Sequence, residues 1–320
     1  MPDPVVQIEN VSKAFGATRA LDQIAFSVSA GELFGLVGPD GAGKSTLFRI
    51  LVSLLEADRG VVRVLGLDPV GDLWALRRQV GYMPGRFALY GDLTVRENLE
   101  FFAAVFGTSV EAEYTSIAPI YQQIERFADR RAGALSGGMK QKLALCCALV
   151  HRPAMLFLDE PTTGVDAVSR REFWDLLGTL RDSGLTTIVS TPYMDEAMRC
   201  DRVALMQTGR ILAIDDPTRL GARFPRPLFG VHTRDRRRVL DLLRTLPLVT
   251  SVFPFGDIVH VSTARVTAHG DDLSDAALAE HLRDGLVAAG LGDAEVRPID
   301  AGIEDLFMEL MGTESTGAAS

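Results

Sequence analysis

The chain of 320 residues has few cysteines and no long apolar run. Its longest uninterrupted apolar run covers residues 143–150, far short of the ~20 residues that a membrane-spanning helix needs. The three cysteines, two of them adjacent, do not suit a disulfide framework or a zinc site, and we expect them to be small core residues in a reducing cytosol. Residues 1–4 lack a basic region followed by an apolar one, so we expect no signal peptide.

Basic residues are outnumbered by acidic ones, with 33 Lys and Arg against 42 Asp and Glu. The formal net charge of −9 argues against nucleic acid or an anionic membrane surface as the main partner. The hydrophobic fraction of 47% and the charged fraction of 23% are those of a globular rather than a disordered protein. The length fits one large domain or two ordinary ones.

A glycine-rich segment follows an apolar run at residues 33–37 and precedes a run of helical spacing at residues 47–52. It fits the phosphate-binding pattern G-x-x-x-x-G-K-[ST]. Glycines let successive N–H groups point inward, and the following helix aims its positive end at the same anion. Lys44 is predicted to reach the β- and γ-phosphates, and the Ser45 hydroxyl to ligate Mg²⁺. The phosphate-binding residues are Gly38, Pro39, Asp40, Gly41, Ala42, Gly43, Lys44, Ser45 and Thr46.

Two further segments have residues suited to a nucleotide. We expect a turn at residues 12–16, in which Phe15 either stacks on an adenine ring or packs under a hairpin. Ser136 is the expected N-cap of a helix, and Gly137 and Gly138 expose backbone N–H groups at its start. That start is a second candidate for anion contact, or an ordinary capped helix.

An apolar run at residues 155–158 ends in two carboxylates, Asp159 and Glu160. In a parallel sheet the carboxyl ends of the strands line the ligand crevice, so both acids should face the phosphates. Asp159 can hold the metal through water, and Glu160 can polarise the water that attacks the γ-phosphate.

The remaining pattern predicts an α/β protein with mostly helical structure at about residues 86–152. There, Thr94 and Glu97 form a capping box. Past residue 217 the order β-α-β-β-α-β is that of a small ferredoxin-like α+β unit. The domains expected are 1–217, 218–312 and a disordered tail at 313–320. Strands are expected at 5–10, 21–28, 60–64, 80–83, 185–190, 203–206, 211–214, 228–233, 249–255, 258–262 and 295–299, and helices at 99–106, 168–181, 235–246, 274–289 and 303–310.

The segments GPDGAGKST, LSGGMKQ and LFLDEPTTGVD, in that order, resemble the nucleotide-binding domain of ATP-binding cassette (ABC) transporters, and the resemblance covers about residues 5–217. It implies a P-loop NTPase core with an antiparallel β subdomain and a helical subdomain, and the C-terminal extension resembles that of drug and polysaccharide exporter ATPases. In the family two cassettes pack head-to-tail around Mg²⁺-ATP. The resemblance implies that Phe15 stacks on adenine, that Ser136, Gly137 and Gly138 contact the partner's ATP, that Glu160 is the hydrolytic carboxylate, and that Asp166 lies in a loop crossing the dimer interface.

Two positions depart from the family pattern. The family has a glutamine that ligates Mg²⁺ and senses the membrane partner where this chain has Gly85, and a histidine that contacts the γ-phosphate where it has Pro192. Gln79 lies at the other end of the strand, about 20 Å away at ~3.3 Å per residue. Proline offers neither a side-chain donor nor a backbone N–H. We therefore expect a degenerate ATP site on this chain, and a heterodimer with a second ABC ATPase subunit is favoured over a homodimer.

The resemblance implies a cytoplasmic ATPase subunit, peripheral at the inner face of the membrane, that dimerises on ATP to drive a separate polytopic permease, with export as the expected direction. An alternative is a nucleotide-gated regulatory subunit with little ATPase activity, paired with a competent one. The cassette proteins of DNA repair need a long coiled coil, and those of translation need two tandem cassettes. This chain has neither feature.

Overall fold

The computed structural model describes residues 4–85, 89–266 and 272–317, with the side chains of 313–317 left aside. The chain divides into two compact units, Met1–Pro217 and Thr218–Ser320. Among the described helices, none is long and apolar enough to cross a membrane.

The first unit contains two sheets. The antiparallel sheet has the order β2-β1-β4 and consists of β1 (Val6–Phe15), β2 (Thr18–Val28) and β4 (Arg59–Val64). The larger sheet has the order β5-β6-β7-β3-β8-β9 and is parallel except for β9. Its strands are β5 (Val80–Met83), β6 (Met155–Asp159), β7 (Thr186–Thr191), β3 (Leu33–Val37), β8 (Arg202–Gln207) and β9 (Arg210–Asp215).

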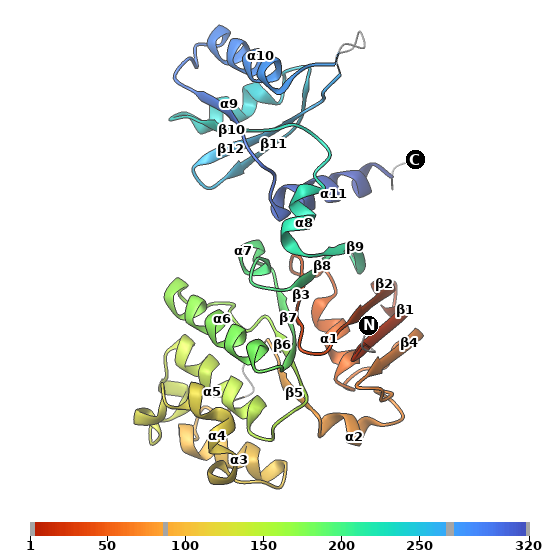
Figure 1. Ribbon diagram of the computed structural model, residues 1–320, viewed down its shortest axis with the longest axis vertical. Coiled ribbons are helices and arrows are strands. Elements are labelled where there is room, and N and C mark those ends of the chain that lie inside the picture. The colour runs from red at the N-terminus through yellow and green to blue at the C-terminus, as the bar shows by residue number, and fades with distance from the viewer. Residues whose placement is uncertain (1–3, 86–88, 267–271, 318–320) are drawn as a thin grey trace. The chain divides into compact units, whose positions relative to one another are not determined.

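Helix α1 (Lys44–Leu51) lies between the two sheets (Figure 1) and packs on both. Its buried face includes Phe48, whose ring meets that of Phe157 edge-to-face at 6.0 Å, and these side chains share one core with Val62 and Val64 of β4. The core therefore fixes the position of the α1 N-terminus relative to the strand ends.

The helical part of this unit lies beside α6 and the parallel strands (Figure 1). Its first helix begins with the expected capping box, since Thr94 and Glu97 each bond to the other's backbone N–H. Of the expected segment, residues 86–88 lie outside the described residues. The helices of the unit are α2 (Leu73–Arg77), α3 (Val95–Val105), α4 (Val110–Tyr121), α5 (Gly137–Leu149), α6 (Ala167–Asp182) and α7 (Met194–Ala197), with 3₁₀ turns at Glu125–Phe127 and Ala132–Ala134.

The second unit has the element order β-α-β-β-α-β in one antiparallel sheet of order β11-β12-β10-β13. Helices α9 and α10 cover one face, and their leucines share a core with Phe229, Val231 and Val261. The elements are α8 (Pro217–Ala222), β10 (Leu228–His232), α9 (Arg236–Leu243), β11 (Val249–Phe255), β12 (Ile258–Thr263), α10 (Asp275–Ala288), β13 (Glu295–Pro298) and α11 (Ile303–Gly317).

Two sequence predictions were wrong. Residues 12–15 are not a turn but the second half of β1, because a left-handed Asn10 (φ 52°) and shifts of register let the strand continue alongside β2 to Phe15. The disordered tail was expected to begin at residue 313, but helix α11 continues to Gly317. Residues 318–320 lie outside the described residues.

Candidate functional site

The glycine-rich segment forms the connection between β3 and α1. Gly41 (φ 80°) and Gly43 (φ 107°) have left-handed backbone conformations, which glycine adopts without steric cost. Gly43 is the N-cap of α1 and supplies no side-chain cap. The first N–H groups of the helix therefore stay available to an anion at the loop.

Lys44 is only 3% exposed although it is charged. Its Nζ donates to the carbonyl oxygens of Gly38 at 2.7 Å and Pro39 at 2.9 Å, and lies 3.0 Å from Glu160 Oε1. The strand order places β6 close to β3, with β7 between them. The sheet thus brings the lysine of the phosphate loop and the acid after β6 into direct contact.

Glu160 itself is held in a conformation unusual for a residue with a side chain. Its φ of 49° is left-handed, which costs about 1–3 kcal/mol. The backbone is held there because the Glu160 N–H donates to both the carbonyl and the hydroxyl oxygen of Ser190, at 3.1 and 2.9 Å. The Ser190 hydroxyl in turn donates to Asp159 Oδ1 at 2.7 Å. Asp159 is thereby oriented at the same strand end.

The residues expected at a metal are Ser45 and Asp159. Among the described residues, no group of three or more His, Cys, Asp or Glu side chains could hold a metal ion. One hydroxyl and one carboxylate fit Mg²⁺, which keeps several waters and takes its other ligands from substrate phosphates.

The two departures from the family pattern lie at this site. A Cβ atom at Gly85 would stand 3.1 Å from the carbonyl oxygen of Asp159, so the segment just after β5 reaches the acidic end of β6. Pro192 directly follows Thr191, which is fully buried and whose carbonyl accepts from the Gly38 N–H. Gln79 is exposed before β5 and donates to the Ala75 carbonyl at 3.3 Å.

The signature segment begins helix α5. Ser136 is its N-cap and accepts from the Met139 N–H at 3.4 Å. Ser136 and Gly137 are exposed, whereas Gly138 is buried against Ser169. Among the described residues, no hydrogen bond or ion pair joins Ser136 or Gly137 to the phosphate loop. The structure therefore does not bring the signature to this chain's own loop.

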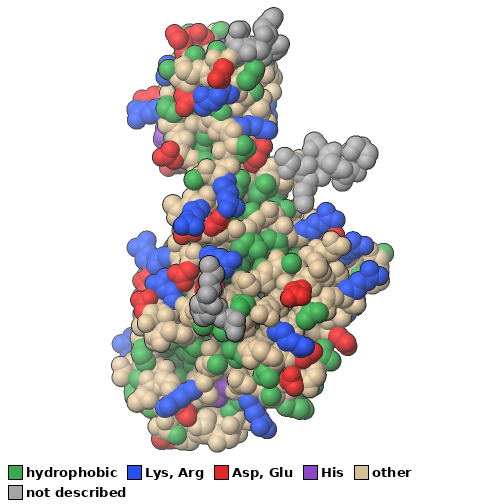
Figure 2. Space-filling model, turned by 45° about the vertical axis from the view of Figure 1, so that its right-hand side comes forward, with side chains coloured by type: hydrophobic (Ala, Val, Ile, Leu, Met, Phe, Trp, Pro, Cys, Tyr) green, Lys and Arg blue, Asp and Glu red, His purple; other side chains and the backbone are tan. Residues whose placement is uncertain are grey.

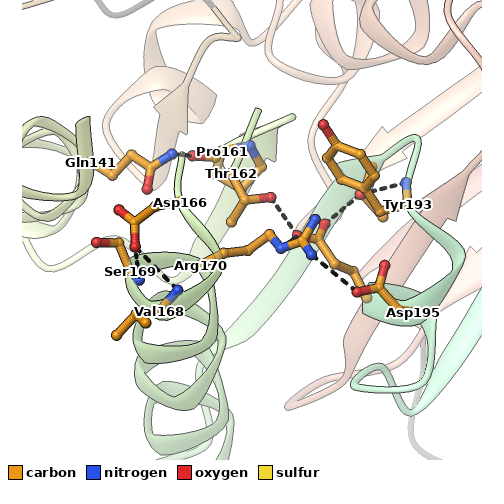
Figure 3. Close-up of polar contacts among 11 residues, drawn as sticks. Gln141, Pro161, Thr162, Asp166, Val168, Ser169, Arg170, Tyr193 and Asp195 are labelled. Carbon is orange, nitrogen blue, oxygen red and sulfur yellow. Dashed lines mark hydrogen bonds and ion pairs between the residues drawn. The ribbon is translucent and has the colours of Figure 1, made fainter. Parts of the chain in front are cut away.

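Asp166 is the N-cap of α6, a role that the sequence analysis missed (Figure 3). Its Oδ1 accepts from the N–H groups of Val168 at 3.1 Å and Ser169 at 3.0 Å. These bonds, first the one from Ser169, lower the pKa of the Asp166 carboxyl. Phe15 ends β1 with half of its surface exposed, and Lys13 Nζ stands 5.8 Å from its ring centre.

A buried polar cluster that the sequence did not predict adjoins the site. Glu196, Thr162, Thr191 and Gln141 are each 3% exposed or less. Their spacing in the sequence carries no recognisable pattern, because the bonds join different strands and helices.

Comparisons with known proteins agree on one family. The family model described as ABC transporter matches residues 21–163. The Nod factor export ATP-binding protein I of Rhizobium sp. (strain N33) is 35% identical over 320 residues, which cover 98% of this chain and 99% of that protein. The chain belongs to the ABC transporter family. As a member of it, the chain carries the ATP-binding cassette of that family.

Other ABC proteins match over about two thirds of the chain. The probable multidrug ABC transporter ATP-binding protein YbhF of Escherichia coli (strain K12) is 41% identical over 223 residues, which are 69% of this chain but only 39% of that protein. This chain therefore spans less than half the length of that relative. An ATP-binding subunit of an ABC transporter superposes with a TM-score of 0.62 at 28% identity, covering 69% of this chain and 93% of that one. The ABC cassette MJ0796, solved as a dimer in a post-hydrolysis state with ADP and Pi, has a TM-score of 0.60 at 26% identity, covering 66% and 98%.

Proposed function

We propose that this ABC subunit works in an exporter with two cassettes, and that the ATP site on its own phosphate loop is the slower of the two. The observation that carries the proposal is the composition of the strand ends around Lys44 and Glu160. The lysine and both acids are in place, while Gly85 and Pro192 supply no side-chain donor or ligand.

In this reading ATP lies on the phosphate loop with Phe15 against its adenine. Mg²⁺, held by Ser45 and through water by Asp159, would neutralise charge on the phosphates. Lys44 stabilises the phosphate oxygens, and Glu160 orients the attacking water and accepts its proton. The signature residues Ser136, Gly137 and Gly138 would serve the partner's ATP, since they are not joined to this chain's loop.

The test is turnover of the purified chain. We expect ATP binding with slow hydrolysis that Glu160→Gln removes while binding persists. Gly85→Gln combined with Pro192→His should raise the rate at least tenfold. Rapid turnover by the unaltered chain, abolished by Glu160→Gln, would contradict the slow-site proposal.

A nucleotide-gated regulatory subunit is the second candidate, favoured by the same Gly85 and Pro192. It predicts no measurable single-turnover hydrolysis even with a competent partner cassette. The heterodimer is supported if a second cassette that has both the glutamine and the histidine binds this chain. A homodimer is supported if this chain alone has full ATPase activity.

The membrane partner has a candidate docking groove on the first unit. The groove has a volume of about 470 Å³, and its lining is mostly apolar, with two arginines. It adjoins β5 just before Gly85, so a helix seated there would lie next to the site. We assign it to a cytoplasmic helix of the permease, which would hold the subunit at the inner face of the membrane. Its lining includes Leu54, Trp74, Arg77, Arg78, Tyr82, Met83, Pro84, Phe102, Val105, Phe106, Ala144, Ala148 and His151.

The groove is tested by Phe102→Asp, with the exposed Val287→Asp on α10 as the control. We expect Phe102→Asp to lose co-purification with the co-expressed permease while ATP binding remains. Retention of the permease would contradict the assignment. Nucleic acid is not proposed as a partner, since the net charge is −9. Lys and Arg side chains are interspersed with Asp and Glu on the face seen in Figure 2.

A further inference from the structure

Glu196 is a buried carboxylate between two catalytic loops. Its Oε1 accepts from the hydroxyl of Thr162 at 2.7 Å, and its Oε2 accepts from the hydroxyl of Thr191. Thr162 follows β6 by three residues, and Thr191 ends β7. In both bonds the threonine hydroxyl is the donor. The Thr191 oxygen is then free to accept from the Tyr193 N–H at 3.0 Å.

Each threonine is bonded to, or lies within two residues of, a residue of the ATP site. The Thr191 carbonyl accepts from the N–H of Gly38, the first residue of the phosphate loop, at 3.2 Å. Thr162 lies two residues after Glu160, and its own carbonyl accepts from the Val165 N–H at 3.3 Å. Glu196 therefore joins the loop that positions the phosphates to the loop that carries the hydrolytic acid.

The same cluster reaches the signature helix (Figure 3). Gln141 of α5 points its amide at the carbonyl oxygen of Pro161 and donates to it. The buried Gly138 packs on Ser169, where a Cβ atom would stand 2.5 Å from the serine hydroxyl. Helix α5 is thus held by Gln141 against the segment that Thr162 anchors, and by Gly138 against the first turn of α6.

Arg170 closes the cluster on its outer side. Figure 3 shows its side chain reaching from α6 toward Asp195, with which it pairs at 3.3 Å. Its Nε lies 3.8 Å from Glu196 Oε1, and its guanidinium lies 4.9 Å from the centre of the Tyr193 ring. The buried negative charge therefore has a cation beside it, which offsets part of its desolvation.

We propose that Glu196 is a positioning residue of the ATPase reaction. It touches neither reacting atom. It fixes the distance between the phosphate-loop side and the Glu160 side, and through Pro161 and Gln141 it holds the signature helix in register with both. Because Pro192 has no polar side chain and no backbone N–H, the loop after β7 contributes to the reaction only by holding the neighbouring segments in place. The inference rests on ATPase activity and not on the proposal that the site is slow.

The test uses the full chain in excess over labelled ATP and Mg²⁺, so that a single turnover is followed however slow it is. Thr162→Val removes one hydroxyl at nearly constant volume, and we expect it to lower the hydrolysis rate about 10- to 100-fold, the usual cost of small misplacement. The ATP dissociation constant should stay within about twofold, since Thr162→Val removes no group that binds the phosphates. Glu196→Gln, which removes one acceptor, should act in the same direction.

Two control variants distinguish loss of the Thr162 hydrogen bond from a general loss of structure. Thr162→Ser keeps the hydroxyl and should restore the rate to within about threefold of the unaltered chain. Thr179→Val, which removes a hydroxyl bonded to the Asp175 carbonyl at an exposed position of α6, should change nothing. An unaltered rate in Thr162→Val, or a rate in Thr162→Ser as low as in Thr162→Val, would overturn the proposal.

Amide hydrogen exchange of the ATP-bound chain needs no turnover. Thr162→Val should speed exchange at the Glu160 and Gly38 N–H groups at least fivefold, and Thr179→Val should not. Equal exchange in both variants would also overturn the proposal. The hydrolysis rate of the unaltered chain tests the slow-site proposal. The ratios of variant to unaltered rates test the role of Glu196, so the two proposals can fail separately.

Discussion

Two glycines of the phosphate loop meet different surroundings. A Cβ atom at Gly43 would stand 2.5 Å from the carbonyl oxygen of Ala20 and 2.8 Å from Met206 Cε. A Cβ atom at Gly41 would meet nothing within 4 Å. Both residues have positive φ. Gly43 is therefore required for two reasons, close packing and backbone conformation, and Gly41 for the second alone.

The difference between Gly41 and Gly43 predicts different losses of stability on substitution by alanine. Gly41→Ala should lower the free energy of unfolding by about 1–2 kcal/mol, the cost of a left-handed non-glycine residue. Gly43→Ala should lower it further, because backbone must also move. Urea unfolding without nucleotide measures both, and equal losses would contradict the role given to the Ala20 contact.

At the scale of elements, His151, which follows α5, contacts both β5 and the end of α3. Its Nε2 is 3.1 Å from the Val80 carbonyl oxygen, and its ring stacks on Phe106 at 3.7 Å with 5° between the planes. Burial lowers the pKa of His151 below its ordinary value of 6.5. The folded protein therefore holds a neutral imidazole, which donates from Nε2 to Val80.

This shift predicts a pH dependence of stability. As pH falls below 6.5, the unfolded chain takes up a proton that the folded chain resists, so the free energy of unfolding decreases. His151→Phe keeps a stacked ring and removes the proton, so its Tm should fall less steeply between pH 7.5 and 5.5. The exposed His281→Gln is the matched control, and a slope in His151→Phe equal to that of the unaltered chain would refute the assignment.

At the scale of the whole molecule, the two units have separate cores. The core around Phe48 and Phe157 and the core around Phe229 and Val261 share no residue. Both tryptophans, the buried Trp174 and the exposed Trp74, belong to the first unit. Tryptophan fluorescence thus reports the unfolding of one unit and far-UV circular dichroism that of both.

We expect the two signals to give different midpoints in urea, since a chain with two cores need not unfold in one step. Phe253→Trp, on half-buried β11, would add a reporter to the second unit and should reveal its own transition. Coincident curves from all three probes would show a single cooperative structure instead.

The sequence by itself determined the features that depend on near neighbours in the chain. The phosphate loop, the capping box at Thr94 and the cap at Ser136 each use residues within a few positions of one another, so their patterns could be predicted. The end of β1 could not be predicted, because the bulge at Asn10 is meaningful only alongside β2. Only the tertiary structure decided which polar groups meet: Lys44 with Glu160, and Glu196 with Thr162 and Thr191. Those contacts follow from the order of parallel strands in the sheet, which brings the loops and helices at their carboxyl ends together. Partners so far apart in the chain leave no pattern in local spacing.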